Sequence, residues 1–163
     1  MYSHRQLTKI MAAWLLKSQS IDLVCWEMAY NTGIVDCIGI SSKISTRKTK
    51  IIAVEVKRTR ADLLQDLRKQ KMLKYEPNST HCILAISHKV FKSNDKKDIK
   101  TELKELGLPN SWGIVILPSN RYFEPYMIKR PKTLGQATSQ GIHKLTRQIA
   151  RSFCNKSLRN PTC

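Results

Sequence analysis

Apolar residues recur along this chain with two spacings, one typical of helices and one typical of buried strands. Ser3 and Gln6 have the spacing of a helix capping box, and the apolar residues after them recur every three or four positions. This pattern predicts an amphipathic helix over Ser3–Lys17. The apolar positions of that helix are Leu7, Ile10, Met11, Trp14 and Leu15.

Short apolar runs bounded by turn residues predict strands in the next part of the chain. The run Ile51–Val56 contains a single charged residue, Glu55, so it is expected to be a central strand. The other expected strands are Leu23–Tyr30, Ile34–Ile40, His81–Ile86, Gly113–Leu117 and, at an edge of the sheet, Tyr122–Met127.

Capping and stop signals predict three further helices. Thr59 and Asp62 have capping-box spacing, and the helix after them is expected to run from about Arg60 to Lys74. We interpret Asp62 as a cap rather than a ligand, and Asp66 with Lys69 as an ion pair on the helix surface. The other two helices are expected from Asp95 to about Gly107 and near Gln140–Asn155.

Strands alternating with helices predict an α/β fold, in which helices flank a central mixed sheet. A length of 163 residues suits one domain with a short appendage. We therefore assign residues 1–128 to the domain and residues 129–163 to a basic C-terminal extension, helical in part, which can dock on the same domain.

A formal net charge of +17 changes the picture, because so large a charge on a chain of this size points to a polyanionic partner. Nucleic acid is favoured over a membrane surface, and the alternative is a solvated basic surface or a ribosomal-type protein. The polar loop Ser41–Lys50 is either a hairpin tip that touches DNA or a charged loop that protects the sheet edge. No acidic residue follows Glu124, which favours phosphate contact over a solvated tail for the last helix.

Cysteine and histidine usage excludes several classes of protein. The five cysteines contain no Cys-x-x-Cys pair, and three of them fall in expected strands, which indicates a reducing, cytoplasmic compartment. The four histidines lack the spacing of a zinc site. No run of apolar residues is long enough to cross a bilayer, and no signal peptide is evident at the N-terminus.

Two acids and a lysine stand out because they interrupt apolar strands. Asp36 is the one charge in its strand, and Glu55 lies two residues before Lys57, so these two side chains point to the same side of a sheet. If the strands pair, both carboxylates can lie at one end of the sheet, where Mg²⁺ or Mn²⁺ would bind between them. The backbone carbonyl of Val56 and, in support, Glu27 are further candidate ligands.

In such a site Lys57 would orient or deprotonate the attacking water, or neutralise charge on a phosphoryl group, while the metal polarises the phosphate. Each residue also has a simpler interpretation. Glu55 with Lys57 would make a cross-strand ion pair, and Asp36 would cap a turn. Apolar strands rarely admit buried acids without a purpose, so the combined pattern favours catalysis.

The motif Val35-Asp36 followed by Glu55-Val56-Lys57 resembles the signature of the PD-(D/E)XK nuclease superfamily, with valine in the place of the proline. The longer run from Glu55, through an apolar strand, to Leu117 resembles the MmcB-like DNA-repair branch of that superfamily. The resemblance covers roughly residues 27–117. The residues that match the longer pattern are Glu55, Lys57, Thr59, Arg60, Asp62, Asp66, Lys69 and Tyr75.

This resemblance implies an αβββαβ restriction-endonuclease-like core and a Mg²⁺-dependent DNA endonuclease. Such an enzyme can work as a homodimer or a larger homo-oligomer. Alternatives are a junction-resolving, phage recombination or homing endonuclease on the same core, or a non-catalytic nucleic-acid binding protein. Alanine at Glu55 or Lys57 is expected to abolish nicking and to leave folding and DNA affinity largely intact. The residues expected to contact DNA are Arg58, Arg60, Arg68, Lys69, Lys71 and Lys48.

Overall fold

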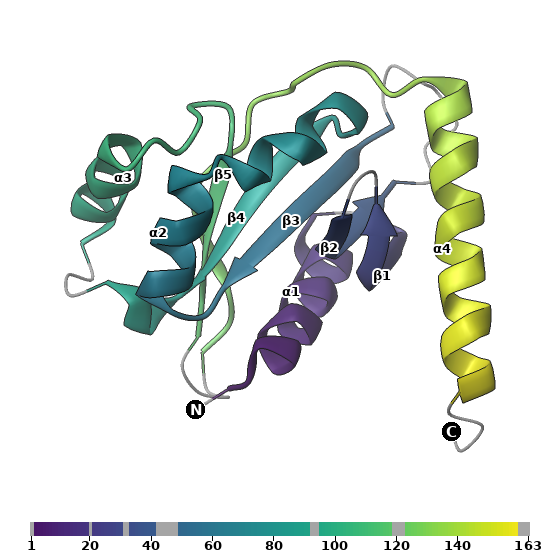
Figure 1. Cartoon of the computed structure of the whole chain (residues 1–163), viewed down its shortest axis with the longest axis horizontal. Coiled ribbons are helices and arrows are strands. Elements are labelled where there is room, and N and C mark those ends of the chain that lie inside the picture. Colours follow the sequence, from purple (N-terminus) through teal and green to yellow (C-terminus); the bar gives the residue numbers. More distant parts are fainter. Residues whose placement is uncertain are drawn as a thin grey trace.

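The computed structural model describes residues 2–19, 21–30, 33–41, 49–91, 95–118 and 123–159. In these residues a six-stranded mixed sheet has helices on both faces and along one edge (Figure 1). The strands are β1 Leu23–Tyr30, β2 Gly33–Ile40, β3 Ile51–Lys57, β4 His81–Ser87, β5 Gly113–Leu117 and β6 Tyr126–Lys129. The helices are α1 His4–Ser18, α2 Arg60–Arg68, α3 Lys96–Glu105 and α4 Ser139–Arg159, with the 3₁₀ helices η1 Lys71–Asn78 and η2 His88–Val90.

The strands lie in the sheet in chain order, and β3 is one of its central members. β3 pairs antiparallel with β2 and parallel with β4, whereas β6 pairs antiparallel with β5. Every residue of β3 is buried except Glu55, which is half-buried. The expectation of a central strand is confirmed, and the unbroken apolar run is typical of a strand that is covered on both faces.

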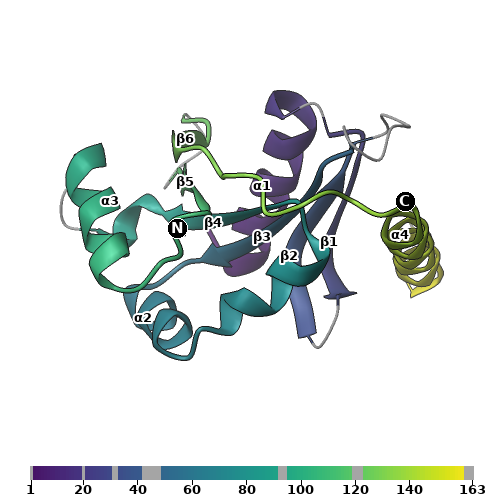
Figure 2. The same ribbon diagram turned by 90° about the horizontal axis from the view of Figure 1, so that it is seen from above.

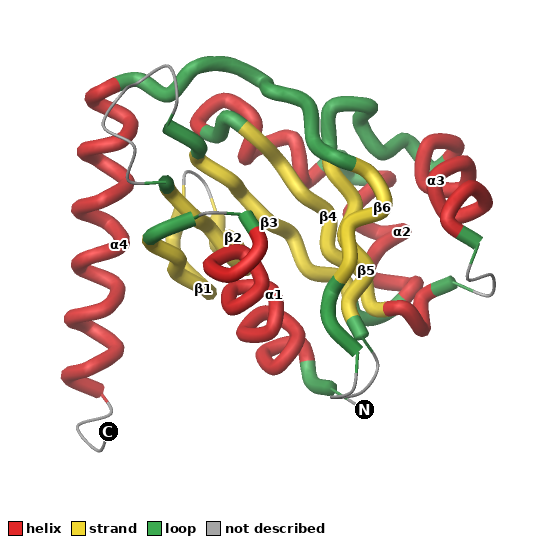
Figure 3. The backbone as a smooth tube through the Cα atoms, turned by 180° about the vertical axis from the view of Figure 1, so that it is seen from behind, coloured by secondary structure: helices red, strands yellow, loops and turns green. Residues whose placement is uncertain are grey.

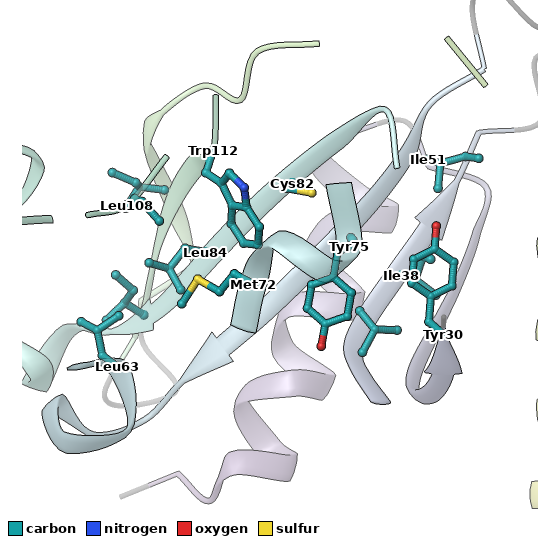
Figure 4. Close-up of a cluster of buried hydrophobic side chains, with 14 of the residues drawn as sticks. Tyr30, Ile38, Ile51, Leu63, Met72, Tyr75, Cys82, Leu84, Leu108 and Trp112 are labelled. Carbon is teal, nitrogen blue, oxygen red and sulfur yellow. The ribbon is translucent and has the colours of Figure 1, made fainter. Parts of the chain in front are cut away.

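Two hydrophobic clusters cover the two faces of the sheet. Helix α1 covers one face, and its Ser3–Gln6 capping box is present as expected (Figure 3). On the opposite face lie α2 and η1, which Figure 2 shows beneath the sheet. Figure 4 shows how η1 contributes to this second cluster, with Met72 beside Leu84 of β4 and Tyr75 near Ile38 of β2.

The expectation of one long helix from Arg60 to Lys74 is wrong. Helix α2 ends at Arg68, and the backbone at Gln70 has a left-handed φ of 49°. A left-handed residue cannot continue an α-helix, so the chain turns there and resumes as the 3₁₀ helix η1. The turn lets both Met72 and Tyr75 reach the sheet, where they are buried.

The C-terminal segment shares the core of the rest of the chain. Strand β6 lies four residues later than expected at its start and ends at Lys129, so the expected boundary at residue 128 falls within a strand. Helix α4 packs along the edge strand β1, where Leu145 and Ile149 are buried in the same cluster as Met28 (Figure 1). Helix α4 therefore contributes side chains to the same hydrophobic cluster as the sheet.

Candidate active site

The edge strand β1 and its neighbour β2 are distorted where Glu27 and Asp36 face each other. Cys25 and Met28 join the same core cluster although they are three residues apart, so the alternation of β1 shifts between them. Glu27 lies at this shift with a left-handed φ of 50°, a conformation that costs an L-residue about 1–2 kcal/mol. The pairing on both sides of the shift places Glu27 opposite Asp36.

Asp36 lies where β2 separates from β3. Regular pairing of these strands stops at Cys37, and beyond it the Asp36 Oδ2 accepts a hydrogen bond of 2.7 Å from the Val56 N–H. The N–H and C=O of one strand residue point the same way, so the Val56 carbonyl also faces the side of Asp36. Beyond Cys37, the Asp36 side chain therefore takes the place of the β2 backbone as the hydrogen-bond acceptor for β3.

His4, at the start of α1, holds the other oxygen of this carboxylate. Its Nε2 lies 3.1 Å from the Asp36 Oδ1, and this hydrogen bond raises the pKa of His4 above its ordinary value. His4 is 32 residues from Asp36 in the chain, and no local pattern marks it as a site residue. Sequence reasoning missed this contact because it depends on how α1 lies across the sheet.

Only one oxygen of the Glu55 carboxylate is paired with a neighbouring group of the described chain. Its Oε1 accepts a hydrogen bond of 2.9 Å from the Lys57 Nζ, whereas its buried Oε2 has no hydrogen-bond partner in the described part of the chain. Burial and then the charge of Asp36 raise the pKa of Glu55, whereas Lys57 and the nearby Tyr75 hydroxyl oppose them. A buried carboxylate oxygen without a partner is unfavourable unless a cation or a donor joins it.

Lys57 is enclosed by acids. Its Nζ pairs with Asp66, lies 2.9 Å from Glu55 and lies 3.5 Å from Asp62, and only 5% of its side chain is exposed. Burial lowers the pKa of Lys57, but the charge of Glu55 and the hydrogen bond to Asp66 outweigh it and raise that pKa. The surrounding acids therefore favour the protonated form of Lys57, which suits orientation and charge neutralisation.

Helix α2 supplies two of these acids because of how it begins. Thr59 caps it by accepting a hydrogen bond of 3.3 Å from the Asp62 N–H, and this turns the first turn of the helix over the end of β3. Asp62 and Asp66 are four residues apart, so they share one face of the helix, and that face meets Lys57. Helix α2 thus places Asp62 and Asp66 over Lys57, which is buried at the end of β3.

One sequence interpretation of α2 is extended and another is wrong. Asp62 lies at the capping position, as expected, and its carboxylate also lies 3.5 Å from the Lys57 Nζ. Asp66 is buried and pairs with Lys57 and Lys71, whereas Lys69 is exposed. The signal that predicts the observed arrangement is the shared helix face of the two acids, taken together with a strand lysine that needs neutralising.

Tyr75 connects η1 to the same region. Its hydroxyl donates a hydrogen bond of 2.8 Å to the Ile34 carbonyl, near the start of β2. Burial and then the charge of Glu55 raise the pKa of Tyr75. Tyr75 therefore keeps its proton beside Glu55 and fixes η1 against the distorted part of β2.

The structure brings together most, but not all, of the expected site residues. Asp36, Glu55, Val56 and Lys57 meet at the rim of β3, but Glu27 is exposed. Among the described residues, no three His, Cys, Asp or Glu side chains form a group that could hold a metal ion. A metal here would therefore depend on two carboxylates and the Val56 carbonyl.

The residues expected to contact DNA differ in their availability. Arg58, Arg68, Lys69 and Lys71 are exposed around α2, although Lys71 also lies 3.4 Å from Asp66. Arg60 pairs with Glu102 of α3, which ties the two helices together. Lys48 lies outside the described residues.

Comparison with known proteins assigns this chain to no family. A scan against protein-family models and a search of curated proteins both find no match. Within the residues that the structure describes, no helix is long and apolar enough to cross a membrane.

Proposed function

We propose that this protein is a metal-dependent DNA endonuclease of the PD-(D/E)XK superfamily, related to its MmcB-like DNA-repair branch. The observation that carries the proposal is the buried Oε2 of Glu55, which has no hydrogen-bond partner among the described residues and lies near Asp36, with Lys57 fixed next to Glu55. The succession α1, β1, β2, β3, α2, β4 supports it, because the superfamily core has the order αβββαβ. The net charge of +17 supports a polyanionic substrate.

The donor set fits a hard divalent cation. Asp36 and Glu55 would hold Mg²⁺ or Mn²⁺ together with the Val56 carbonyl, because all three offer oxygen ligands and the two carboxylates repel each other without a cation. When bound, such an ion polarises the phosphate and lowers the pKa of its water.

The other residues of the site position these groups and hold the substrate. Lys57 keeps its proton, orients Glu55 and offsets negative charge near the phosphate. His4 and the Val56 N–H fix the Asp36 carboxylate. The exposed Arg58 lies next to Lys57, and its guanidinium can engage two phosphate oxygens of the DNA backbone.

Plasmid cleavage tests the proposal. We expect nicking with Mg²⁺ or Mn²⁺ and none with EDTA. Loss of a residue that only hydrogen-bonds to a metal ligand typically lowers activity roughly 10- to 100-fold. Glu55 is a proposed ligand itself, so we expect Glu55→Gln to reduce the cleavage rate by more than this. Glu105→Gln, an exposed acid of α3, is the matched control and should cut at the wild-type rate. Equal rates for the wild type and Glu55→Gln would refute the assignment.

One observation favours a second candidate, a nucleic-acid binding protein that does not cut. Lys57 already has three acidic partners, Glu55, Asp62 and Asp66, so the cluster is stable as an ion-pair network without substrate. Plasmid, single-stranded and branched DNA distinguish the two candidates. Binding to any of them in EDTA, with no cutting of any in Mg²⁺ or Mn²⁺, would favour the binding protein.

A further inference from the structure

A cavity of about 600 Å³ lies at the end of the sheet opposite to the candidate active site. Lys50 and Ile52 line it at the start of β3, whereas Glu55 and Lys57 lie at the end of that strand. The last residues of α1 and the strand β6 complete its walls, and the segment after β6 crosses this end of the sheet (Figure 3). The cavity is therefore separate from the cluster around Lys57.

The charges that line this cavity have one sign. Lys50, Lys129 and Arg130 line it, and no acidic residue of the described ranges does. In the described part of the chain, none of these three cations takes part in an ion pair. Burial and then the neighbouring charges of Lys132 and Lys100 lower the pKa of Lys129. A gathering of cations without an acid is unfavourable by itself and favours an anion that would bind there.

The rest of the lining is apolar or neutral. Ile52, Met127 and Ile128 form an apolar wall. His81 lies 2.8 Å from the Thr80 Oγ1 and 3.3 Å from the Thr133 Oγ1, so both of its ring nitrogens have partners in the wall. A cavity of this volume is in the range of small-molecule sites and exceeds what a lone phosphate ion needs.

We propose that this pocket binds the phosphate of a nucleotide, with Lys50, Lys129 and Arg130 around the phosphate and the Ile52–Met127 wall against the base. Arg130 supplies the forked donors that match phosphate oxygens, and the two lysines add charge without a fixed geometry. The nucleotide is either a free mononucleotide or the phosphate-bearing end of a strand, since both present the same group. The proposal does not depend on cleavage at Glu55.

Calorimetric titration with dAMP and with inorganic phosphate, in EDTA and at physiological salt, tests the pocket. We expect the wild type to bind dAMP, and Lys129→Gln/Arg130→Gln to bind it at least about tenfold more weakly, because charged hydrogen bonds are lost. Lys104→Gln removes the same charge from an exposed position of α3 and should stay within about twofold of the wild type. Lys50→Gln provides a second pocket variant if the double variant does not fold.

Oligonucleotides with a 5′-phosphate or a 5′-hydroxyl end distinguish the two sources of the group. Binding of dAMP, or of the phosphorylated oligonucleotide alone, supports the pocket if the double variant loses it. The proposal is overturned if the wild type binds none of these ligands, or if Lys104→Gln weakens binding as much as the double variant. Glu55→Gln should bind dAMP normally and the double variant should still nick plasmid, so the pocket and the nuclease proposal can fail separately.

Discussion

The two ends of β3 carry opposite kinds of charge imbalance. At its C-terminal end, three acids surround Lys57, and Glu55 still has an oxygen without a partner. At its N-terminal end, Lys50 belongs to a pocket lined by cations and by no acid. A strand buried on both faces can carry charged groups only near its ends. At the C-terminal end of β3 the Glu55 Oε2 calls for a cation, and at the N-terminal end the cations of the pocket call for an anion.

The acidic end is the more informative of the two because acids are scarce in this chain. Only 12 residues are Asp or Glu, against 29 Lys and Arg. Four of those acids, Asp36, Glu55, Asp62 and Asp66, gather around the end of β3. In a chain with so many cations, three of these acids share the single cation Lys57 instead of each pairing with a separate one.

The largest expected effect comes from removing the cation at the acidic end. Lys57→Met leaves Glu55 without its ion-pair partner and Asp66 with only the exposed Lys71, and breaking a buried ion pair costs about 3–5 kcal/mol of unfolding free energy. This revises the expectation that a Lys57 substitution leaves folding intact, because Lys57 is buried. Urea unfolding at neutral pH measures the change.

A second substitution tests whether the loss comes from the stranded acids. Asp66→Asn added to Lys57→Met should recover at least about 1 kcal/mol, because coupled residues of one ion-pair network are not additive. If Lys57→Met unfolds within about 1 kcal/mol of the wild type, the acids do not depend on Lys57 and the network described here is wrong.

A smaller effect is expected from pH at the same end of the strand. The hydrogen bond to Asp36 raises the pKa of His4 above 6.5, so the folded state binds this proton more tightly than the unfolded state. The stabilisation is fully present below about pH 6.5 and is lost as the pH rises through the higher folded-state pKa. Its size should stay below about 1 kcal/mol, since the side chain is 42% exposed.

Unfolding free energies measured from pH 5 to pH 9 check this sign. His4→Gln should remove that part of the decline in stability with rising pH, and the exposed His143→Gln of α4 should not. Identical pH profiles for the wild type and His4→Gln would show that His4 does not hold Asp36.

The smallest effect is expected at the basic end. The charge of Lys132 lowers the pKa of Lys129, so Lys132→Gln should raise the unfolding free energy by no more than about 0.5 kcal/mol at low salt. High salt should remove the gain, because it screens exposed charges. Lys104→Gln is the control, and destabilisation by Lys132→Gln at low salt would mean that the cations do not repel one another.

Periodicity predicted the framework well because it reflects burial along single elements. The bounds of β1 and β5, the capping box of α1 and the central position of β3 all follow from local patterns. The break after α2 was not predictable in this way. The residues from Arg60 to Lys74 have helical spacing throughout, and the left-handed turn at Gln70 depends on where Met72 and Tyr75 must reach the sheet.

The site was only partly predictable for the same reason. The spacing of Glu55 and Lys57 places them on one side of β3, and the structure confirms their contact. The contact of His4 with Asp36 joins residues that are far apart in the chain. The burial of Asp66 depends on the angle at which α2 leaves β3, and sequence spacing alone cannot distinguish a solvent-facing pair from a buried one.

Binding of Mn²⁺ is the most direct test of the claim that the Glu55 Oε2, which has no hydrogen-bond partner among the described residues, belongs to a metal site. Calorimetric titration of the wild type without DNA should show a Mn²⁺ site that is lost in Glu55→Gln and in Asp36→Asn and retained in Glu105→Gln. The same titration of Glu27→Gln shows whether Glu27 contributes, and the exposed position of its side chain predicts a small change. Mn²⁺ binding that is equally tight in the wild type and in Glu55→Gln would contradict the account.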